Sequence, residues 1–327
     1  MAVRTFPERD QLNICFAHPS YRLSERFALR NTGLNAFEVR THEQLQARIG
    51  EADVLLVSGM LWRNEYLEQA PRLVFLQSIS AGMDHYDKDA FRQRGIRLTS
   101  AQGTNAVAVA EHALALILAL ARKIPMARDN QAARHWRSPI SDLAQREDEL
   151  SGKTLLVVGF GRIGQKLATL AKAFGMRVIA VKRDVAHGTQ GADQVVAQQD
   201  LLRVLPEADF VALTCPLTPE TENLIDAAAL AAMKPAAQLI NVARGRVVHE
   251  PSLIAALKAG GIAGAALDCV WEEPLPAESP LWDMGNVLIT PHVGGETAQF
   301  EDNLLDVLLE NLDRLARGQA DLVNATV

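Results

Sequence analysis

The chain has 327 residues, enough for two compact domains at roughly 150 residues each. Hydrophobic residues make up 48% and charged residues 22%, values that disfavour a disordered, collagen-like or disulfide-scaffold chain. The balance of 33 Lys and Arg against 39 Asp and Glu leaves a net charge of −6, which gives no electrostatic reason to expect nucleic acid or an anionic membrane as a partner. A small molecule is therefore the expected partner.

The cysteine content and the apolar stretches bear on compartment, metal and membrane. The three cysteines lie far apart with no CxxC pair, so we expect neither a disulfide framework nor a bound metal. The N-terminus lacks the apolar segment of a signal peptide. The most apolar stretch, residues 106–121, is 16 residues long and contains a Glu and a His, which is too short and too polar for a membrane span. A cytoplasmic protein is expected.

Short runs rich in Val, Ile and Leu alternate with helical patterns, as in βαβ units around a parallel sheet. The strands are expected at residues 13–17, 37–40, 54–58, 73–78 and 96–99, and again at 154–159, 177–181, 210–214, 238–242, 263–268 and 287–290. Their nearly continuous apolar character indicates that both faces of each sheet are covered. The sequence thus predicts an α/β chain with two doubly wound parallel sheets.

Three further segments surround these strands. A long helix is expected from about Asn105 to Arg122, followed by a polar linker or arm over residues 123–150. Near the C-terminus, leucines from Leu304 to Leu315 recur at helical spacing on one face. That last helix could return to the first domain.

The string GFGRIG places Gly159, Gly161 and Gly164 between the apolar strand TLLVV and a helical run. In this setting the first glycine permits a tight turn, the second lets the backbone approach a pyrophosphate, and the third allows close packing of helix on strand. Unpaired N–H groups at the helix start attract the anion. The pattern indicates a dinucleotide site, and a plain strand-helix turn is the alternative.

Two basic residues, Lys182 and Arg183, end the next strand, where NAD-binding folds usually place an acid for the ribose 2′-hydroxyl. Two cations at that position would pair with a 2′-phosphate. We therefore predict NADP as the preferred cofactor, with NAD possible. The alternative is that the pair is solvated and Asp184 binds the ribose.

Charged residues follow three consecutive strands of the second sheet, where ligands bind in such folds. Arg244, Asp268, Glu273 and His292 could therefore converge on one cleft. A His suits proton transfer near neutral pH, a carboxylate beside it favours the imidazolium, and an Arg can hold a carboxylate and polarise an oxo group. Taken singly, each residue has a plainer reading as an ion pair, a turn residue or a loop histidine. Their shared placement favours hydride-transfer chemistry.

Several motifs in order along the chain carry a family resemblance. They are QSISAGMDHYD (77–87), GTNAVAVAEHALALILALAR (103–122), GKTLLVVGFGRIG (152–164), CPLTPETENLID (215–226), INVARGRVV (240–248), LDCVWEEPLP (267–276) and ITPHVGG (289–295). The chain resembles the D-isomer-specific 2-hydroxyacid dehydrogenases. In having the basic pair Lys182-Arg183 after the strand expected at residues 177–181, it resembles the NADP-using glyoxylate and hydroxypyruvate reductases.

The resemblance implies a site and a domain plan. Catalysis would fall to Arg244, Glu273 and His292, and substrate binding to Ser80, Ala81, Gly82, Met83, Asn105, Met60 and Trp136. Cofactor contacts are implied at Gly159, Gly161, Arg162, Ile163, Gly164, Lys182, Arg183, Cys215, Pro216, Thr221, Val242, Ala243, Arg244, Asp268, His292 and Gly294. Residues 1–101 and 296–327 would form a flavodoxin-like substrate domain, with a Rossmann cofactor domain over 102–295 inserted in it. The segment 105–150 would join two copies into a homodimer.

The expected reaction is hydride transfer between NAD(P)H and a small 2-keto acid or D-2-hydroxy acid. Formate dehydrogenases carry Gln beside the His, so Glu273 argues against that activity. Two alternatives stay open. One is an NAD-dependent dehydrogenase for a larger 2-hydroxy acid, and the other is a nucleotide-sensing binding protein of the corepressor kind on the same fold.

Overall fold

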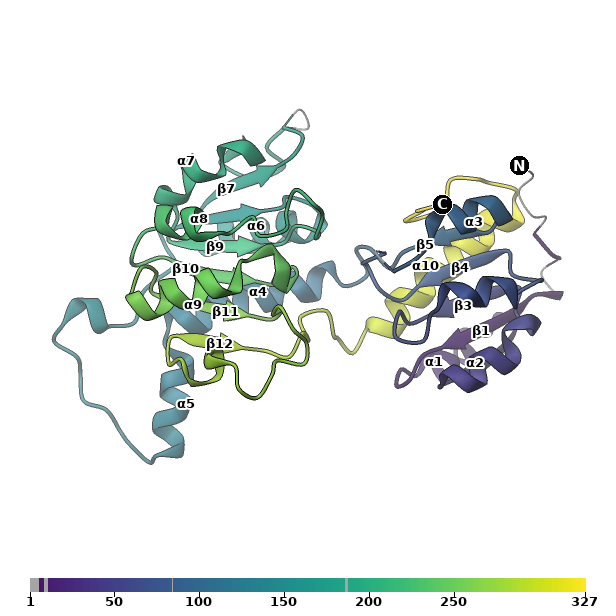
Figure 1. Ribbon diagram of the computed structural model, residues 1–327, viewed down its shortest axis with the longest axis horizontal. Helices are drawn as coiled ribbons and strands as arrows, with labels where there is room; N and C mark the ends of the chain where they lie inside the picture. The colour runs from purple at the N-terminus through teal and green to yellow at the C-terminus, as the bar shows by residue number, and fades with distance from the viewer. Residues whose placement is uncertain (1–5, 9–10, 84, 186–187) are drawn as a thin grey trace. The chain divides into compact units, whose positions relative to one another are not determined.

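The structure, a computed structural model, describes residues 6–8, 11–83, 85–185 and 188–327. The chain folds as two compact units (Figure 1). Unit 1 comprises Met1–Asn105 and Thr297–Val327, and unit 2 comprises Ala106–Glu296. The sequence-based divisions were placed after residues 101 and 295, and the assignment of substrate and cofactor roles to the two units stays a prediction.

Unit 1 is built on a parallel sheet with the order β2-β1-β3-β4-β5 in its described part. Its strands are β1 (Asn13–Ala17), β2 (Asn35–Val39), β3 (Val54–Val57), β4 (Phe75–Ser78) and β5 (Arg97–Thr99), and its helices are α1 (Leu23–Ala28), α2 (His42–Arg48), α3 (Lys88–Arg94) and α10 (Phe300–Ala316). Alternate side chains of β1 enter two separate cores, Cys15 on one face and Phe16 on the other. Helices therefore cover both faces, in the flavodoxin-like strand order.

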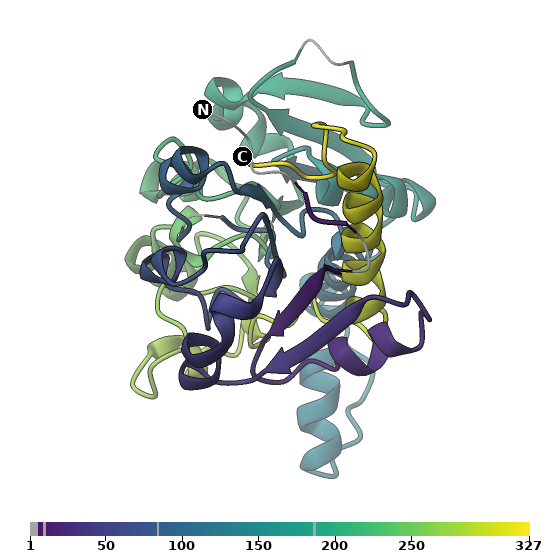
Figure 2. The ribbon, with the colours of Figure 1, turned by 90° about the vertical axis from the view of Figure 1, so that its right-hand side faces the viewer.

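Helix α10 belongs to unit 1 although about 200 residues of the chain separate it from that unit's other strands and helices. The helix spans residues 300–316, whereas the other elements lie within residues 13–99. Its apolar face, which includes Leu304, Leu308 and Leu312, packs with Phe16 in one core cluster. The Gln77 side chain of β4 donates a hydrogen bond to the Leu304 carbonyl over 3.0 Å. Figure 2 shows this helix running alongside the unit 1 sheet. The single apolar face read from the sequence is thus buried against the first sheet.

Unit 2 contains a second parallel sheet, whose order among the described residues is β12-β11-β10-β9-β6-β7-β8. The strands are β6 (Thr154–Val158), β7 (Arg177–Lys182), β8 (Gln194–Ala197), β9 (Phe210–Leu213), β10 (Gln238–Asn241), β11 (Gly264–Leu267) and β12 (Val287–Ile289). The helices are α4 (Ala106–Ala121), α5 (Ile124–Ala132), α6 (Arg162–Ala173), α7 (Leu201–Val204), α8 (Ala227–Ala232) and α9 (Glu250–Ala259). The strand order reverses between β6 and β9, and this is the place where dinucleotides bind in such sheets.

The central strand β6 explains why unit 2 is covered on both faces. Its five residues are all buried, and they divide by alternation. Leu156 and Val158 enter the core that includes side chains of α7, α8 and α9, whereas Leu155 and Val157 enter the core that includes α4 and α6. A strand apolar on both sides is stable only between two layers of helices. The predicted fold class, two doubly wound parallel sheets, is confirmed.

Two details differ from the sequence-based expectations. The expected second series had six strands, and the structure adds the edge strand β8 (Gln194–Ala197), whose residues are mostly half-buried. Such a short edge strand lacks the continuous apolar run of the central strands. The polar segment 123–150 was expected as a linker or arm, and it begins with helix α5, which projects from unit 2 together with the chain that follows it (Figure 1).

Candidate active site

The glycine turn after β6 lies at the switch point of the unit 2 sheet. Gly159 has φ of +95°, and a Cβ atom there would stand 2.5 Å from the Cα of Cys215, which follows β9. A Cβ on Gly164 would meet the Gly159 carbonyl oxygen at 2.5 Å. No side chain fits at either position, so the turn requires glycine at both for the reasons expected from the sequence.

Gly161 differs from the other two glycines because a Cβ there would meet no atom within 4 Å. It is the N-cap residue of α6, the helix that starts at Arg162. The first turn of a helix presents backbone N–H groups that the helix itself does not use, and these attract anions. Gly161 therefore opens onto space at a helix N-terminus, where a pyrophosphate could approach the backbone.

The two basic residues at the end of β7 have different surroundings. The Lys182 ammonium donates hydrogen bonds to the Gly188 carbonyl at 3.0 Å and to Gln190 Oε1 at 3.4 Å. Arg183 is exposed. A hydrogen bond from Thr218 and one from the backbone N–H of Glu220 lower the pKa of the Glu220 carboxyl, and the charge of Arg183 lowers it further. Arg183 is thus the more available cation at this strand end.

The segment after β9 borders the turn. The Thr221 hydroxyl donates to the Pro216 carbonyl at 2.7 Å and accepts from the Thr218 N–H at 2.7 Å, which fixes the loop. Cys215 is buried, and burial raises the pKa of its thiol to about 11. This thiol is therefore neutral and serves as a small packing residue.

Asp268, directly after β11, is almost completely buried and accepts several hydrogen bonds. Its donors are the Thr290 hydroxyl at 2.6 Å and the backbone N–H groups of Val293 and Gly294, each at 3.0 Å. Burial alone would raise the pKa of Asp268, but His112 and these hydrogen bonds lower it to about 2. The carboxylate is ionised, and it anchors the two residues that follow His292.

The sequence reading missed the part that His112 plays in this network. His112 lies in the long helix α4, and its Nε2 is 3.0 Å from the Thr290 hydroxyl and 3.3 Å from Asp268 Oδ1. Helix α4 is separated from β12 by six strands along the chain. No local pattern connects these residues, so only the fold brings them together.

The predicted pairing of Glu273 with His292 is present. His292 Nδ1 lies 2.7 Å from Glu273 Oε2, and Glu273 Oε1 accepts the Val270 N–H at 3.1 Å. Hydrogen bonds from the ring to Cys269 and Glu273 outweigh burial and raise the pKa of His292 to about 10. Burial opposes ionisation of Glu273, but the hydrogen bond and charge of His292 and the charge of Arg244 lower its pKa. The pair is an imidazolium-carboxylate couple at neutral pH.

His292 is held in an uncommon backbone conformation. Its φ is +54°, in the left-handed region that non-glycine residues seldom adopt. Its N–H donates to the Thr290 carbonyl at 2.9 Å, and the Asp268 carboxylate binds the next two amides. Asp268 thus fixes the loop that presents the imidazole.

Arg244 follows β10 on a loop that a neighbouring glycine brings close to the Glu273 loop. A Cβ on Gly245 would stand 1.9 Å from the Val270 carbonyl oxygen, so the two loops touch only because residue 245 is glycine. The Arg244 guanidinium donates to the Ala243 carbonyl at 2.6 Å, and Asn241 Nδ2 donates to the Arg244 carbonyl at 3.0 Å. The residues before it, Val242 and Ala243, are buried.

Cys269 is a second residue that the sequence reading did not place in the site. Its side chain is buried, and its Sγ lies 3.5 Å from the Ala243 carbonyl oxygen. One donor atom each from Cys269, Glu273 and His292 lie within 4.8 Å of one another. Cys269 follows β11 and His292 follows the next strand, β12, so no CxxC spacing marks them and sequence spacing could not identify this cluster.

The predicted substrate residues of unit 1 follow its strands β3 and β4. The loop of Ser80, Ala81, Gly82 and Met83 comes after β4, and the Ser80 N–H donates to Ser78 Oγ at 3.0 Å. Met60 follows β3 and is 75% exposed, whereas Met83 packs in the unit 1 core. Asn105 is the last residue of the unit's first segment and is half-buried.

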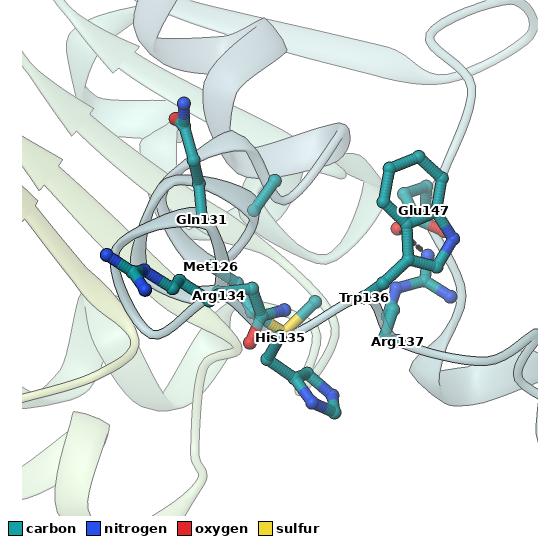
Figure 3. Close-up of a pocket in the computed structure, with 9 residues that line it drawn as sticks. Met126, Gln131, Arg134, His135, Trp136, Arg137 and Glu147 are labelled. Atoms are coloured by element: carbon teal, nitrogen blue, oxygen red, sulfur yellow. Dashed lines mark hydrogen bonds and ion pairs between the residues drawn. The ribbon is translucent and has the colours of Figure 1, made fainter.

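Trp136 lies on the arm of unit 2, where its side chain is 97% exposed. It borders a hollow of about 580 Å³ between α5 and the chain that follows, and an ion pair joins Arg137 to Glu147 beside it (Figure 3). The structure therefore places Trp136 on the arm, apart from the loops that carry the Glu273–His292 pair.

A membrane-crossing helix is not found in the described part of the chain, where every helix is too short or too polar.

Comparisons with known proteins match this chain to a family. The family model of the D-isomer specific 2-hydroxyacid dehydrogenase NAD-binding domain matches residues 114–294. A glyoxylate reductase from Thermococcus litoralis is 39% identical over 296 residues, which cover 86% of this chain and 87% of the relative. A D-3-phosphoglycerate dehydrogenase from Methanocaldococcus jannaschii is 36% identical over 285 residues, covering 85% of this chain but only 52% of that longer protein.

A solved structure shows the same likeness over the whole chain. It is a D-isomer specific 2-hydroxyacid dehydrogenase family protein from Aeromonas salmonicida, with a TM-score of 0.85 and 32% sequence identity. The match covers 97% of this chain and 99% of that one.

Proposed function

Because the chain belongs to the D-isomer-specific 2-hydroxyacid dehydrogenase family, we propose that it is an NAD(P)-dependent oxidoreductase that interconverts a small 2-keto acid and its D-2-hydroxy acid. The observation that carries this proposal is the 2.7 Å contact between Glu273 and His292 on loops after β11 and β12. Arg244 follows the adjacent strand β10. The three residues thus leave neighbouring strands at the edge where ligands bind.

The roles of the three side chains follow from their chemistry. In the reductive direction, His292 as imidazolium donates a proton to the oxygen at C2, and in the oxidative direction the neutral ring removes it. Glu273 accepts the Nδ1–H and thereby leaves Nε2 to exchange the proton. Arg244 holds the substrate carboxylate and polarises the adjacent oxo group through its forked donors. Proton transfer, orientation of the imidazole and substrate binding are thus assigned to one residue each, and the Arg244 and Glu273 loops are in contact at Gly245 and Val270.

The residues of unit 2 fit a dinucleotide. Gly161 leaves open space at the start of α6, which suits a pyrophosphate bound to backbone N–H groups of Arg162 and Ile163. Pro216, Thr221, Val242, Ala243 and Gly294 would border the rest of the cofactor, with Asp268 toward the carboxamide. When bound, the reduced nicotinamide supplies the hydride to C2.

For the choice of nucleotide we propose NADP over NAD. Arg183 is exposed at the end of β7 and supplies a fork for a 2′-phosphate, while Lys182 adds charge from its position beside Gln190. The Arg183→Ala variant is expected to raise KM for NADPH by about tenfold or more and to leave KM for NADH nearly unchanged. Arg203→Ala, which removes an exposed arginine from α7, is the matched control.

For the substrate we propose glyoxylate or hydroxypyruvate, because similar proteins are named glyoxylate reductase and, at 35% identity, glyoxylate/hydroxypyruvate reductase B. Backbone N–H groups of residues 80–83 would bind the acid's carboxylate, and Asn105 and Met60 would shape its surroundings. Trp136 would reach the acid from the second copy of a homodimer. A larger acid is the second candidate, because a relative named D-3-phosphoglycerate dehydrogenase is 36% identical to this chain, which spans about half its length.

We also propose a cytoplasmic homodimer formed through residues 105–150. This segment carries exposed large apolar side chains that a second copy would cover, namely Val107 on α4 and Ile124, Met126, Trp136 and Leu143 on the arm. Sedimentation of the Trp136→Ala variant tests this assembly, since a weaker dimer is expected and an unchanged one would count against the arm.

The test of the proposed function is a panel of 2-keto acids assayed with NADPH and with NADH. Turnover of glyoxylate or hydroxypyruvate, faster with NADPH, is the expected result. Reduction of larger acids alone would favour the second candidate. Nucleotide binding with no turnover on any acid would favour a nucleotide-sensing protein and refute the proposal.

A further inference from the structure

The side chains of Cys269, Glu273 and His292 form a set of potential metal ligands of three different kinds. One thiol sulfur, one carboxylate oxygen and one ring nitrogen lie within 4.8 Å of one another. Cys269 lies at the buried base of the group, at 2% exposure, whereas the Glu273 and His292 side chains are 37% and 43% exposed. An ion could therefore approach past the two open side chains and reach the sulfur.

We propose that Cys269, Glu273 and His292 bind a thiophilic divalent cation, represented by Zn²⁺, and that this ion reversibly blocks the site. The three side chains would supply three corners of a tetrahedron, with water at the fourth, as in zinc sites that keep one open position. Binding itself does not depend on the proposed function, whereas the block of turnover rests on it.

The distances require little movement. Zinc bonds of about 2.0–2.3 Å to nitrogen, oxygen and sulfur place tetrahedral ligand atoms roughly 3.3–3.6 Å apart. If Nδ1 and Oε2 are the donors, the present 2.7 Å between them would open by about 0.6 Å. Any pair at the outer limit of 4.8 Å would close by about 1.2 Å. Side-chain rotation at the two open residues can supply such changes.

The donor set determines which ions fit. Cysteine sulfur with imidazole and one carboxylate suits Zn²⁺, Cd²⁺ or Co²⁺, whereas Mg²⁺ and Ca²⁺ prefer sites made only of oxygen. A thiolate and a carboxylate together offset the two positive charges of the ion. The Ala243 carbonyl, 3.5 Å from the Cys269 sulfur, holds the thiol at the base of the group before the ion arrives.

Occupation by the ion uses the same atoms that catalysis needs. An ion on Nε2 would occupy the nitrogen that exchanges the proton with the oxygen at C2. An ion on Nδ1 would replace the hydrogen bond to Glu273, and the metal-bound ring could not become the imidazolium that reduction requires. The ion would therefore act as a reversible inhibitor that leaves the fold intact. Mg²⁺ would leave the site as it is.

The binding experiment uses the purified chain, without cofactor, and Co²⁺ as a spectroscopic probe of thiolate ligation. We expect one Co²⁺ per chain, with a sulfur-to-cobalt charge-transfer band that Zn²⁺ abolishes and Mg²⁺ does not. The Cys269→Ala variant should lack the band. Cys15→Ala is the matched control, because Cys15 is an equally buried free thiol in unit 1, and it should keep the band.

A second variant keeps the test decisive if Cys269→Ala does not fold. Glu273→Gln changes a side chain that is 37% exposed and should fold normally. Calorimetric titration with Zn²⁺ should show its Kd raised at least about tenfold, since a carboxylate ligand becomes a poor one. A band that persists without Cys269, or a Kd unchanged by Glu273→Gln, would overturn the proposed site.

The inhibition arm measures keto-acid reduction with and without Zn²⁺, each variant being compared with its own metal-free rate. The inhibition constant of the wild type should match the Kd from titration, and Cys269→Ala should lose at least about tenfold in sensitivity. Zinc binding without any effect on turnover would overturn the blocking role. If no keto acid is reduced, the proposed function fails, but the binding result still decides the metal site.

Discussion

The Glu273→Gln variant separates the charge of the carboxylate from its position. The amide oxygen of Gln can still accept a hydrogen bond from His292 Nδ1 across the present 2.7 Å, but it carries no negative charge. In the wild type, hydrogen bonds to Cys269 and Glu273 raise the pKa of His292 to about 10. Removing the charge should therefore lower this pKa while leaving the ring in place.

The expected size follows from the type of hydrogen bond exchanged. A hydrogen bond to a charged group contributes about 1.5–3 kcal/mol and a neutral one about 0.5–1.5 kcal/mol. A difference of about 1.4 kcal/mol corresponds to one pKa unit. Because the two side chains are 43% and 37% exposed, solvent screens the pair. We therefore expect a shift of about one pH unit rather than several.

The assay is kcat/KM against pH in both directions, with a chelator present. Reduction needs the imidazolium, so its rate should fall as pH rises through the pKa of His292. Oxidation needs the neutral ring, so its rate should rise through the same pKa. In Glu273→Gln both limbs should move to lower pH by the same amount, with reduction near pH 7 reduced less than about tenfold.

The matched control is Glu272→Gln, which removes the same charge from the adjacent exposed residue. Its two limbs should coincide with those of the wild type. Two results for Glu273→Gln would refute the reasoning. One is that the pH profiles of kcat/KM do not move at all. The other is that the profiles for reduction and oxidation move in opposite directions, in which case one group could not serve as both acid and base.

Four further variants test the loops. Gly161→Ala should keep the stability of the wild type, because its Cβ meets nothing within 4 Å, but it should raise the cofactor KM about tenfold. Gly159→Ala is strained at φ of +95° and should lose about 2 kcal/mol of unfolding free energy, measured in urea. Equal effects of the two variants on cofactor KM and on stability would contradict the separate roles assigned to Gly161 and Gly159. Gly245→Ala should lower kcat about a hundredfold, because its Cβ would stand 1.9 Å from the Val270 carbonyl and displace a loop. Arg244→Lys should lower kcat/KM at least about tenfold, since a point charge cannot replace the fork, and a wild-type value would remove the clamp role.

Much of the fold could be predicted because central parallel strands are apolar on both faces. β6, for example, is buried throughout, and the expected run of residues 154–159 contains it. The edge strand β8 was not predicted. It pairs only with β7, on one side, and an edge strand needs fewer apolar residues than a central strand. Helix α5 was missed because its sequence mixes polar with apolar residues and none of its side chains is buried.

The candidate site was predictable where one motif lies on one loop. The glycine turn and the residues Arg244, Glu273 and His292 each sit in a short segment after a strand, so strand order alone predicts that they meet. His112 and Cys269 were not predictable in this way. Their partners come from other elements, and the contacts depend on side-chain packing that no spacing in the sequence records.

The central claim is that His292 transfers the proton during keto-acid reduction. Its most direct test is single-turnover reduction of glyoxylate or hydroxypyruvate by saturating NADPH in the wild type and in His292→Ala, with cofactor affinity measured separately. The account predicts a reduction rate lower by about 10²- to 10⁴-fold at unchanged cofactor affinity. An unchanged rate in His292→Ala would contradict it.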